Sequence, residues 1–297
     1  MTAEIAHRPV MVAEVLAHLA PARGGVFVDG TVGLGGHARA VLEAGAATVI
    51  GIDRDPAAVE RAREALAEFG GRAVVEHGDY RRFEDVLDAR GVTAVAGLFV
   101  DLGVSSMQLD TPGRGFSFRR DEPLDMRMDP TTGPTAAELI AGADERTLAD
   151  VIYEFGEERR ARRIARALVR ARDEAPVATT AQLAALARRG APGRPHTWRI
   201  DPATRTFQAI RVWVNDELEG LDGFLGRAAR RLDAGGRLVV LTFQSLEDRV
   251  VKHAFRALAA EGAYTVRTKR PERAGESELM ENPRARSAKL RAVERDG

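Results

Sequence analysis

One stretch near the N-terminus constrains the fold of this 297-residue chain more than any other. Residues 26–37 read Val-Phe-Val-Asp-Gly-Thr-Val-Gly-Leu-Gly-Gly-His, an apolar run that breaks abruptly into glycines. Such a run predicts a buried strand that enters a tight turn before a helix. Glycines suit that turn because they adopt left-handed backbone angles and leave room for a ligand. The N-terminal amides of the helix, which we expect from about Ala38, would point toward that ligand.

An acidic residue closes the second apolar run of the chain. That run, residues 48–52, ends in Asp53. A carboxylate about 20 residues beyond a glycine turn commonly accepts hydrogen bonds from the hydroxyls of a ribose. The sequence therefore predicts a cofactor that contains a nucleoside.

Two classes of nucleoside cofactor use such an arrangement. Gly33, Gly35 and Ala38 satisfy the dinucleotide fingerprint in its Gly/Ala form, which keeps a nicotinamide or flavin cofactor open, as well as a purely structural turn. Asp29, followed by Gly30, favours S-adenosylmethionine (SAM) instead. A carboxylate is unfavourable beside a pyrophosphate, whereas a sulfonium cofactor with an amino-acid tail tolerates one. We therefore expect SAM as the cofactor.

Composition limits both the compartment and the chemistry. The chain contains no cysteine, which excludes disulfides, thiolate metal sites and cysteine nucleophiles. Its six histidines are scattered without an i,i+4 pair, so we expect no metal site. Basic and acidic residues number 44 each, so any nucleic-acid footprint must be local. The N-terminus has no signal pattern and no apolar run reaches membrane-spanning length, so we expect a soluble, cytoplasmic protein without a membrane partner.

Strands and helices then alternate along the chain. We expect further strands at residues 73–77 and 95–101, with helices at residues 56–69 and from Phe83. Such alternation predicts a parallel, doubly wound α/β sheet, and ligands bind beyond the carboxyl ends of its strands. The residues expected at that edge are Asp29, Asp53, the pair Asp79-Tyr80, and Asp101.

The alternation stops between residues 107 and 205. Residues 111–134 are rich in Gly, Pro, Arg and Asp and predict an extended loop, and helical patterns follow up to Arg189. We expect residues 107–205 to form an inserted, mostly helical second domain that recognises RNA or another substrate. Residues 1–106 and 206–297 would together form the first domain, which carries the sheet.

The last part of the chain returns to the sheet. We expect one helix over residues 207–231, a fifth strand at 237–243, and a helix that starts at Ser245 with the capping-box pattern Ser-Leu-Glu-Asp. Two short strands at residues 264–269 and 287–293 would close the sheet as a hairpin-like pair.

A helix expected at residues 157–172 carries many arginines on one face. Helical periodicity places Ile164 and Leu168 on the opposite, apolar face. The basic face has two interpretations, a solvated helix surface or a patch that binds an anionic polymer such as RNA. The arginines of this face are Arg159, Arg162, Arg163, Arg166 and Arg170.

Several longer motifs lie within and between these segments. They are Asp29-Gly30-Thr31 with Gly33 and Gly35-Gly36-His37, then residues 52–56, 101–106, 108–110, 114–118, 123–129, 204–209, 245–249 and 281–287. On these motifs, and almost end to end, the chain closely resembles the bacterial ribosomal RNA small subunit methyltransferase H family, the MraW-type cytosine-N4 methyltransferases.

The resemblance implies a Rossmann-like class I SAM-dependent methyltransferase sheet. It implies that the protein transfers a methyl group from SAM to N4 of a cytosine in the decoding region of 16S ribosomal RNA, within the small ribosomal subunit. The resemblance leaves open whether the protein forms a homodimer. The residues that would contact SAM are Gly35, Gly36, His37, Asp53, Tyr80, Asp101 and Gln108. For Tyr80 a role as a core aromatic, and for Gln108 a role as a loop amide, are the alternatives.

Asp101 is the candidate catalytic residue. An enzyme that methylates N4 must accept hydrogen bonds from the amine and hold it in line with the sulfonium methyl. Amino-methyltransferases that act on DNA commonly end strand four with Asp or Asn, two prolines and an aromatic residue, and residues 101–104 keep only the carboxylate. Asp101 would therefore accept hydrogen bonds from the cytosine amine, or would contact only SAM. Phe116 and Phe118 are candidates for stacking on the base.

Two positions depart from the family pattern. Gln244 and Asp201 stand where the family usually has histidine. Glutamine cannot take up a proton near neutral pH, but a methylated amine can lose its proton to water, so we expect an active enzyme. Two rival interpretations are an NAD-dependent oxidoreductase, for which the sequence offers no persuasive general acid, and a non-catalytic RNA-binding protein, which would not need the glycine turn and Asp53 together.

Overall fold

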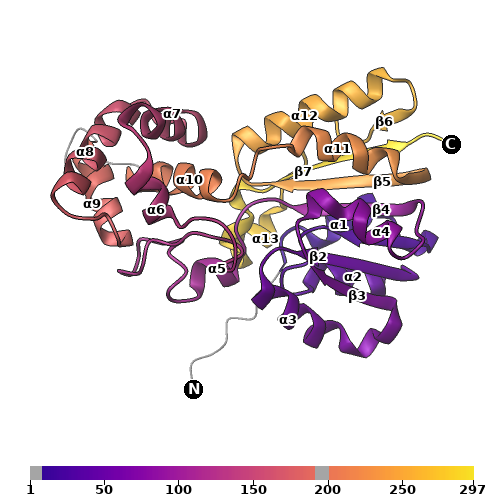
Figure 1. Cartoon of the computed structure of the whole chain (residues 1–297). Coiled ribbons are helices and arrows are strands. Elements are labelled where there is room, and N and C mark those ends of the chain that lie inside the picture. The colour runs from indigo at the N-terminus through magenta and orange to yellow at the C-terminus, as the bar shows by residue number, and fades with distance from the viewer. Residues whose placement is uncertain (1–8, 191–200) are drawn as a thin grey trace. The chain divides into compact units, whose positions relative to one another are not determined.

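The computed structural model describes residues 9–190 and 201–297 (Figure 1). The chain divides into two compact units, a sheet unit of Met1–Gly103 with Glu219–Gly297 and a helical unit of Val104–Leu218. The helical unit extends beyond residues 107–205, where we expected the insertion. The reason is helix α10 (Ala203–Val214), whose apolar side chains belong to the hydrophobic core of the helical unit.

The sheet unit contains a seven-stranded sheet in the order β3-β2-β1-β4-β5-β7-β6. The strands are β1 (Val26–Asp29), β2 (Thr48–Asp53), β3 (Ala73–His77), β4 (Val95–Asp101), β5 (Leu232–Thr242), β6 (Tyr264–Val266) and β7 (Lys289–Arg295). Strands β1 to β5 pair in parallel, whereas β7 runs antiparallel to both β5 and β6. The expected α/β class is confirmed. The strand order reverses between β1 and β4, which is where doubly wound sheets bind ligands.

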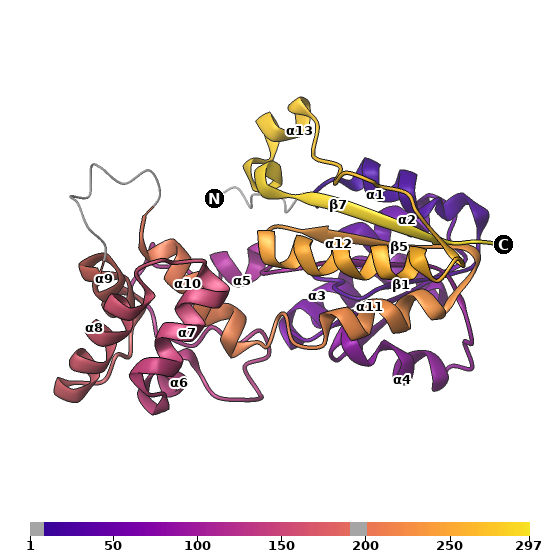
Figure 2. The same cartoon turned by 90° about the horizontal axis from the view of Figure 1, so that it is seen from above.

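Helices accompany the strands of the sheet unit. They are α1 (Val12–Leu19), α2 (Gly36–Glu43), α3 (Pro56–Leu66), α4 (Phe83–Asp88), α11 (Leu221–Arg230), α12 (Ser245–Ala260) and α13 (Glu276–Glu281). Figure 2 shows α11 and α12 running side by side along the sheet. Val239 and Leu241, alternate residues of β5, belong to one core cluster with Val15 and Leu19 of α1. This alternation is the period of two that a strand with two covered faces requires.

The single helix that we expected over residues 207–231 is wrong. The chain forms two helices there, because α10 ends at Val214 and α11 begins at Leu221. Asp216 and Gly220 adopt left-handed backbone angles, with φ of 49° and 65°, and these angles end a right-handed helix. Apolar spacing continues across the break, so the sequence pattern alone joined the two helices.

The helical unit is built from six helices within its described residues. They are α5 (Ser106–Asp110), α6 (Ala136–Gly142), α7 (Glu145–Gly156), α8 (Ala161–Glu174), α9 (Thr180–Gly190) and α10. Its core includes Ile152 of α7, Leu168 of α8, Leu183 of α9 and Ile210 of α10, all fully buried. Residues 111–135 form neither helix nor strand apart from an isolated bridge. The expected start of α8 at Glu157 is wrong, since Glu157 ends α7 with φ of 48°.

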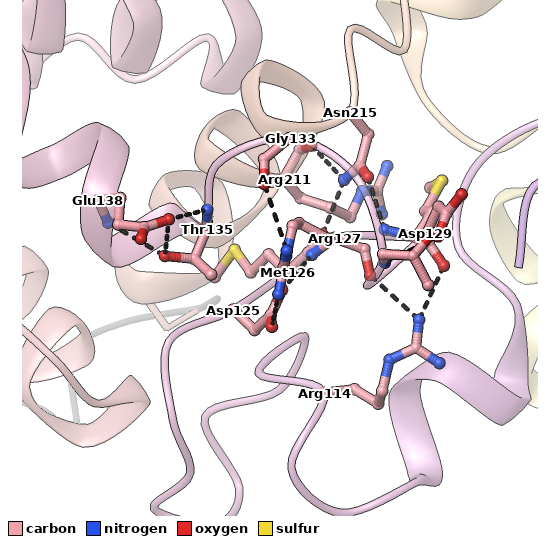
Figure 3. A network of polar contacts seen from close by, with 12 residues as sticks. Arg114, Asp125, Met126, Arg127, Asp129, Gly133, Thr135, Glu138, Arg211 and Asn215 are labelled. Atoms are coloured by element: carbon pink, nitrogen blue, oxygen red, sulfur yellow. Dashed lines mark hydrogen bonds and ion pairs between the residues drawn. The ribbon is translucent and has the colours of Figure 1, made fainter.

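Side-chain hydrogen bonds hold the loop around Met126 to α10 (Figure 3). Met126 is fully buried and adopts a left-handed backbone with φ of 63°. Asn215 accepts a hydrogen bond from the Met128 N–H at 2.7 Å and donates one to the Met126 carbonyl at 2.8 Å. Arg114 donates to the carbonyls of Arg127 and Met128 at 3.0 and 2.9 Å. The loop conformation therefore depends on Asn215, which is distant in sequence, and on Arg114 from an earlier part of the same connection.

We predict that Asn215→Ala lowers the free energy of unfolding by about 2–4 kcal/mol, because it leaves buried backbone groups of the loop without partners. Urea denaturation of the full chain, followed by circular dichroism, measures the loss. Gln208→Ala is the matched control, since this amide on the same helix donates one hydrogen bond, to the Phe155 carbonyl at 3.0 Å. Its expected loss is about 1 kcal/mol, and equal losses in the two variants would contradict the prediction.

Candidate active site

The site lies at the carboxyl ends of β1 and β4. Gly30 follows β1 directly, and its N–H donates a hydrogen bond to the Phe99 carbonyl of β4 at 2.8 Å. A Cβ on Gly30 would lie 2.7 Å from Cγ1 of Val100 and 3.0 Å from Cβ of Tyr80, so only glycine fits there. Gly35 then takes φ of 83° immediately before α2. The structure thus contains the expected glycine turn between the first strand and a helix.

Asp53, at the end of β2, fixes this turn through its carboxylate. One oxygen accepts a hydrogen bond from the Gly33 N–H at 2.8 Å, and the other accepts from the Asp55 N–H at 2.9 Å. Burial raises the pKa of Asp53 to about 6, although both hydrogen bonds act to lower it. A carboxylate has about four acceptor positions, so Asp53 retains acceptor positions for the hydroxyls of a ribose.

Three carboxylates, which we call the carboxylate cluster, lie at the ends of adjacent strands. They are Asp29 at the end of β1, Asp101 at the end of β4, and Glu247 in the first turn of α12, which follows β5. Thr31 connects the first two, since its N–H donates to Asp29 at 3.1 Å and its hydroxyl accepts from the Asp101 N–H at 2.7 Å. Within the described chain, the buried atoms Oδ2 of Asp29 and Oδ1 of Asp101 have no hydrogen-bond partner.

Two members of the carboxylate cluster, Asp29 and Asp101, have pKa values well above the usual range for carboxyl groups. Burial raises the pKa of Asp29 to about 7. Burial, followed by repulsion from Asp29 and Glu247, raises the pKa of Asp101 to about 8. Perturbed groups of this kind, together in one place, are typical of functional sites.

Glu247 is the member of the carboxylate cluster that sequence reasoning missed. We expected Ser245 to cap α12, but the N-cap is Gln244. Glu247 accepts hydrogen bonds from the N–H groups of Phe243 and Gln244 at 3.0 and 3.1 Å. A Cβ on Gly103 would lie 3.9 Å from Oε1 of Glu247, so this side chain reaches the turn after β4. The capping-box pattern correctly marked a helix start, but nothing in it pointed to Asp101.

Tyr80 lies beside the glycine turn. Its ring packs edge-on against the ring of Phe224, with centroids 4.7 Å apart and planes at 73°. Its Cβ is the atom that a Cβ on Gly30 would approach. Tyr80 is partly buried. Tyr80 therefore packs against Phe224, and its contact with SAM stays a prediction.

The carboxylate of Asp79, which precedes Tyr80, is paired with two arginines. Its carboxylate forms ion pairs of 2.5 Å with both Arg54 and Arg81. Burial alone would raise the pKa of Asp79, but the hydrogen bonds from Arg81 and the charge of Arg54 lower it to about 2. Among the acidic residues expected at this edge, Asp79 is thus a structural anion.

His37 and Gly36 pack against the segment that precedes α1. The ring of His37 is buried, with Nε2 2.9 Å from the Val10 carbonyl and its centroid 4.7 Å from that of Phe99. A Cβ on Gly36 would collide with the ring of Pro9. Both residues therefore close the N-terminal segment onto the glycine turn, and their contact with SAM stays a prediction.

Gln108 belongs to the helical unit and lies in the first turn of helix α5, which begins at Ser106. Its side-chain oxygen accepts a hydrogen bond from the Ser105 N–H at 3.0 Å, and the Ser105 hydroxyl accepts one from the Gln108 N–H at 3.2 Å. This reciprocal pair is a capping box. The other residues expected to contact SAM lie in the sheet unit, so a role of Gln108 in that site is a prediction that rests on the resemblance.

The expected basic face lies on and just before α8. All five arginines are exposed, while Ile164 and Leu168 are buried as the periodicity predicted. Arg159 precedes the helix. Arg166 approaches Glu145 of α7 at 3.4 Å. The side chains of the other four arginines form no hydrogen bond or ion pair within the described parts of the chain.

The two candidate stacking rings are engaged in packing. Phe116 is buried in the core of the helical unit. Phe118 packs edge-on against Phe207, with centroids 5.0 Å apart, and the guanidinium of Arg188 lies 5.5 Å from its centroid. Arg188 also forms an ion pair of 2.7 Å with Asp201, one of the two positions where the family usually has histidine. Neither ring is therefore favoured as a platform for a base.

Two further findings concern other classes of site. In the residues that the structure describes, no three His, Asp or Glu side chains are grouped so as to hold a metal ion. The helices of the described ranges are all too short or too polar to cross a membrane.

Comparisons with known proteins agree with one another. Residues 4–296 match the model of the MraW methylase family. A ribosomal RNA small subunit methyltransferase H of Deinococcus radiodurans is 52% identical over 289 residues, which cover 97% of this chain and 89% of that protein. Proteins with the same name are 51% identical in Sorangium cellulosum, covering 98% of this chain and 91% of that protein, and 49% identical in Nitrobacter winogradskyi, with the same coverage.

We predict that Asp101→Asn stabilises the protein without ligands as pH rises. The pKa of Asp101 is about 8 in the folded chain and the ordinary value is 3.8, so the folded state binds more protons between these values and loses stability as pH increases. The variant lacks this loss, so its stability relative to the unmodified protein should increase by about 1–3 kcal/mol between pH 5 and pH 8.

Urea denaturation at the two pH values measures this difference. Asp79→Asn is the control, because its low pKa keeps Asp79 ionised and paired at both pH values, so its loss should destabilise the protein at both. A stability difference for Asp101→Asn that does not change with pH would show that Asp101 titrates normally.

Proposed function

Because this chain belongs to the MraW methylase family, we propose that it methylates the exocyclic N4 amine of a cytosine in the decoding region of 16S ribosomal RNA. The resemblance found in the sequence is confirmed at the level of the family. SAM is the cofactor of such an enzyme, as expected. The relatives are named as methyltransferases of small-subunit ribosomal RNA, and the choice of cytosine N4 extends the resemblance to this chain.

The observation that carries the proposal is the fit of the sheet edge to SAM. Asp53 holds the glycine turn and retains acceptor positions for the ribose hydroxyls. Asp29 and Asp101 present buried oxygens with no hydrogen-bond partner within the described chain, which suits a positively charged ligand. The amides at the start of α2 suit the carboxylate of an amino-acid tail. An NAD-dependent oxidoreductase would leave the two buried carboxylates beside a pyrophosphate, which is electrostatically unfavourable.

The residues of this site have to overcome the weak nucleophilicity of cytosine N4, whose lone pair is delocalised into the ring. SAM, when bound, supplies a methyl group on a positively charged sulfur. We assign to Oδ1 of Asp101, which is buried without a hydrogen-bond partner in the described chain, the acceptance of hydrogen bonds from the amine as its nitrogen becomes pyramidal. This is a task of positioning and electrostatics. After the transfer, the methylated nitrogen is positively charged and acidic, so its proton can pass to water.

Gln244 fits this proposal without a protonic role. Its N–H donates to Glu247 at 3.1 Å and its carbonyl accepts from the Asp248 N–H at 3.1 Å, so its backbone begins α12. Glutamine can hydrogen-bond through its side chain but cannot take up a proton near neutral pH. The chemistry above requires no base at this position.

A transfer assay tests the proposed function. The purified protein is incubated with labelled SAM and small ribosomal subunits from cells that lack the modification, and the RNA nucleosides are separated by mass spectrometry. We expect N4-methylcytidine within the decoding region, and no label in large subunits. A methyl group on C5, on a ribose or on another RNA would overturn the proposed specificity. Binding of labelled NADH but not SAM would overturn the reaction itself.

We predict that Asp53→Ala weakens SAM binding by about 1.5–3 kcal/mol, roughly a 10- to 150-fold loss of affinity, because charge-assisted hydrogen bonds to the ribose are removed. From the sequence we expected the fold to be unaffected. The structure adds a loss of stability, because the Gly33 and Asp55 N–H groups lose their acceptor. Calorimetric titration and thermal melts separate the two effects.

Asp144→Ala is the matched control for Asp53. Asp144 also accepts a hydrogen bond from a backbone N–H, that of Thr147 at 2.7 Å, but it caps α7 in the helical unit. Its replacement should lower stability and leave SAM affinity unchanged. An unaltered SAM titration in Asp53→Ala would refute the assignment of the ribose site.

We assign recognition of RNA to the helical unit, whose exposed arginines on α8 provide a local positive charge on a chain of zero formal net charge. Replacing Arg162, Arg163 and Arg170 by Gln should weaken binding to the small subunit. It should also flatten the salt dependence by about 0.7–0.9 log unit for each phosphate that the protein no longer neutralises. Filter binding at several salt concentrations measures both.

The matched control removes the same charge elsewhere. Arg61, Arg230 and Arg256 are exposed residues of the sheet unit, and their joint replacement by Gln should leave the salt slope unchanged. If both triple variants behave like the unmodified protein, the face on α8 is merely solvated.

A cytoplasmic location is part of the same proposal, because the RNA substrate is found there. The possible homodimer stays a prediction, and sedimentation of the purified protein would test it.

A further inference from the structure

The carboxylate cluster has an electrostatic property that the proposed transfer of a methyl group does not use. Asp29, Asp101 and Glu247 come from three elements, and Asp53 of β2 adds its repulsion to Asp29. In residues 9–190 and 201–297, no basic side chain forms an ion pair or hydrogen bond with Asp29 or Asp101. The charged groups that shift the pKa values are Asp53 for Asp29, and Asp29 and Glu247 for Asp101, and all of them are acidic.

Burial makes this concentration of negative charge unfavourable. The side chain of Asp29 is 3% exposed, and the pKa values of Asp29 and Asp101 rise to about 7 and about 8. A buried carboxyl without a cation keeps its proton, whereas a nearby cation favours its ionised form. Near neutral pH the cluster without a ligand therefore holds protons that it would lose if a positive charge arrived.

We propose that the carboxylate cluster is a proton-exchanging counter-charge for the sulfonium of SAM, and that it releases a proton when SAM binds. The inference rests on the proposed function, because it takes SAM as the cofactor. Its geometric basis is the position of Asp29, Asp101 and Glu247 at the ends of the adjacent strands β1, β4 and β5. The two buried oxygens of Asp29 and Asp101 without partners in the described chain are the atoms available to face the cation.

The proposal separates the cofactor from its product by charge. S-adenosylhomocysteine, the product, lacks one methyl group and one positive charge relative to SAM. It therefore lacks the sulfonium charge that would ionise the cluster, and releases fewer protons on binding than SAM does. Because a released proton is a product of binding, SAM affinity should rise with pH up to the pKa of Asp101, about 8, and the affinity for S-adenosylhomocysteine should rise less.

Isothermal titration calorimetry of the full chain tests the proposal. SAM and S-adenosylhomocysteine are titrated at pH 6.8 in phosphate and in an amine buffer, whose ionisation enthalpies differ. The pH lies below the ordinary pKa of an α-amino group, about 7.7–8.0, so the amino-acid tails of both ligands stay protonated. We expect SAM to release about half to one proton more than S-adenosylhomocysteine. Between pH 6 and 7, SAM affinity should rise at least about threefold.

Variants test whether the proton that is released when SAM binds comes from the carboxylate cluster. Asp101→Asn has no proton to release there, so release with SAM should fall by at least about half. Glu247→Gln, which keeps an oxygen for the Phe243 and Gln244 N–H groups, should also reduce it. Asp248→Asn is the control: although burial opposes it, hydrogen bonding and charge from Arg291 lower the pKa of Asp248, so this group is already ionised.

The outcomes are distinct. Equal proton release for both ligands, or undiminished release in both cluster variants, would overturn the inference while SAM binding supports the proposed function. Failure of both ligands to bind would overturn the proposed function and this inference with it.

Discussion

The arrangement of the site depends on the two hydrogen bonds that the Asp53 carboxylate accepts from backbone N–H groups. One bond reaches back to Gly33 in the turn after β1, and the other reaches forward to Asp55 at the start of α3. A single side chain thus fixes the turn after one strand relative to the helix that follows the next. The same carboxylate can accept these two hydrogen bonds and still accept others from a ligand. An ionised carboxyl has more acceptor positions than the two backbone N–H groups occupy.

Around this fixed turn the protein places charge where burial disfavours it. Asp29 and Asp101 belong to strands whose other side chains are almost all apolar and buried, so their carboxyls carry a desolvation penalty that packing elsewhere has to offset. Such local conflict with stability is common at functional sites. The contrast with Asp79, which two arginines neutralise a few residues beyond β3, shows that the same residue type at the same edge serves two purposes.

Much of the sheet unit was predictable because its signals are local. The break from an apolar run into glycine at Gly30, and the Asp55-Pro56 helix start, each use a few consecutive residues and each matches the structure. The errors arose where a distant contact or a single backbone angle decides. Asp216 interrupts an apolar pattern that looks continuous, and Glu157 separates α7 from α8 by one left-handed residue.

Residues of the site divide in the same way. Asp53 and Asp101 could be placed from the strand ends that they close. Glu247 could not, because its proximity to the turn after β4 depends on the pairing of β4 with β5, which lie on either side of the insertion. Gln108 shows the converse: a family motif implies a ligand contact, whereas its visible hydrogen bonds belong to a helix cap.

That pairing has a consequence for the order in which the chain can be completed during synthesis. Strand β4 is buried along nearly its whole length, but β5, its partner on one side, begins only at Leu232. Until the entire insertion has been made, the backbone N–H and C=O groups on that edge of β4 have no strand to pair with. Unpaired edges of strands that carry apolar side chains invite pairing with other chains. The nascent protein therefore passes through a stage at which its central strand needs protection from aggregation, and the length of the insertion sets how long that stage lasts.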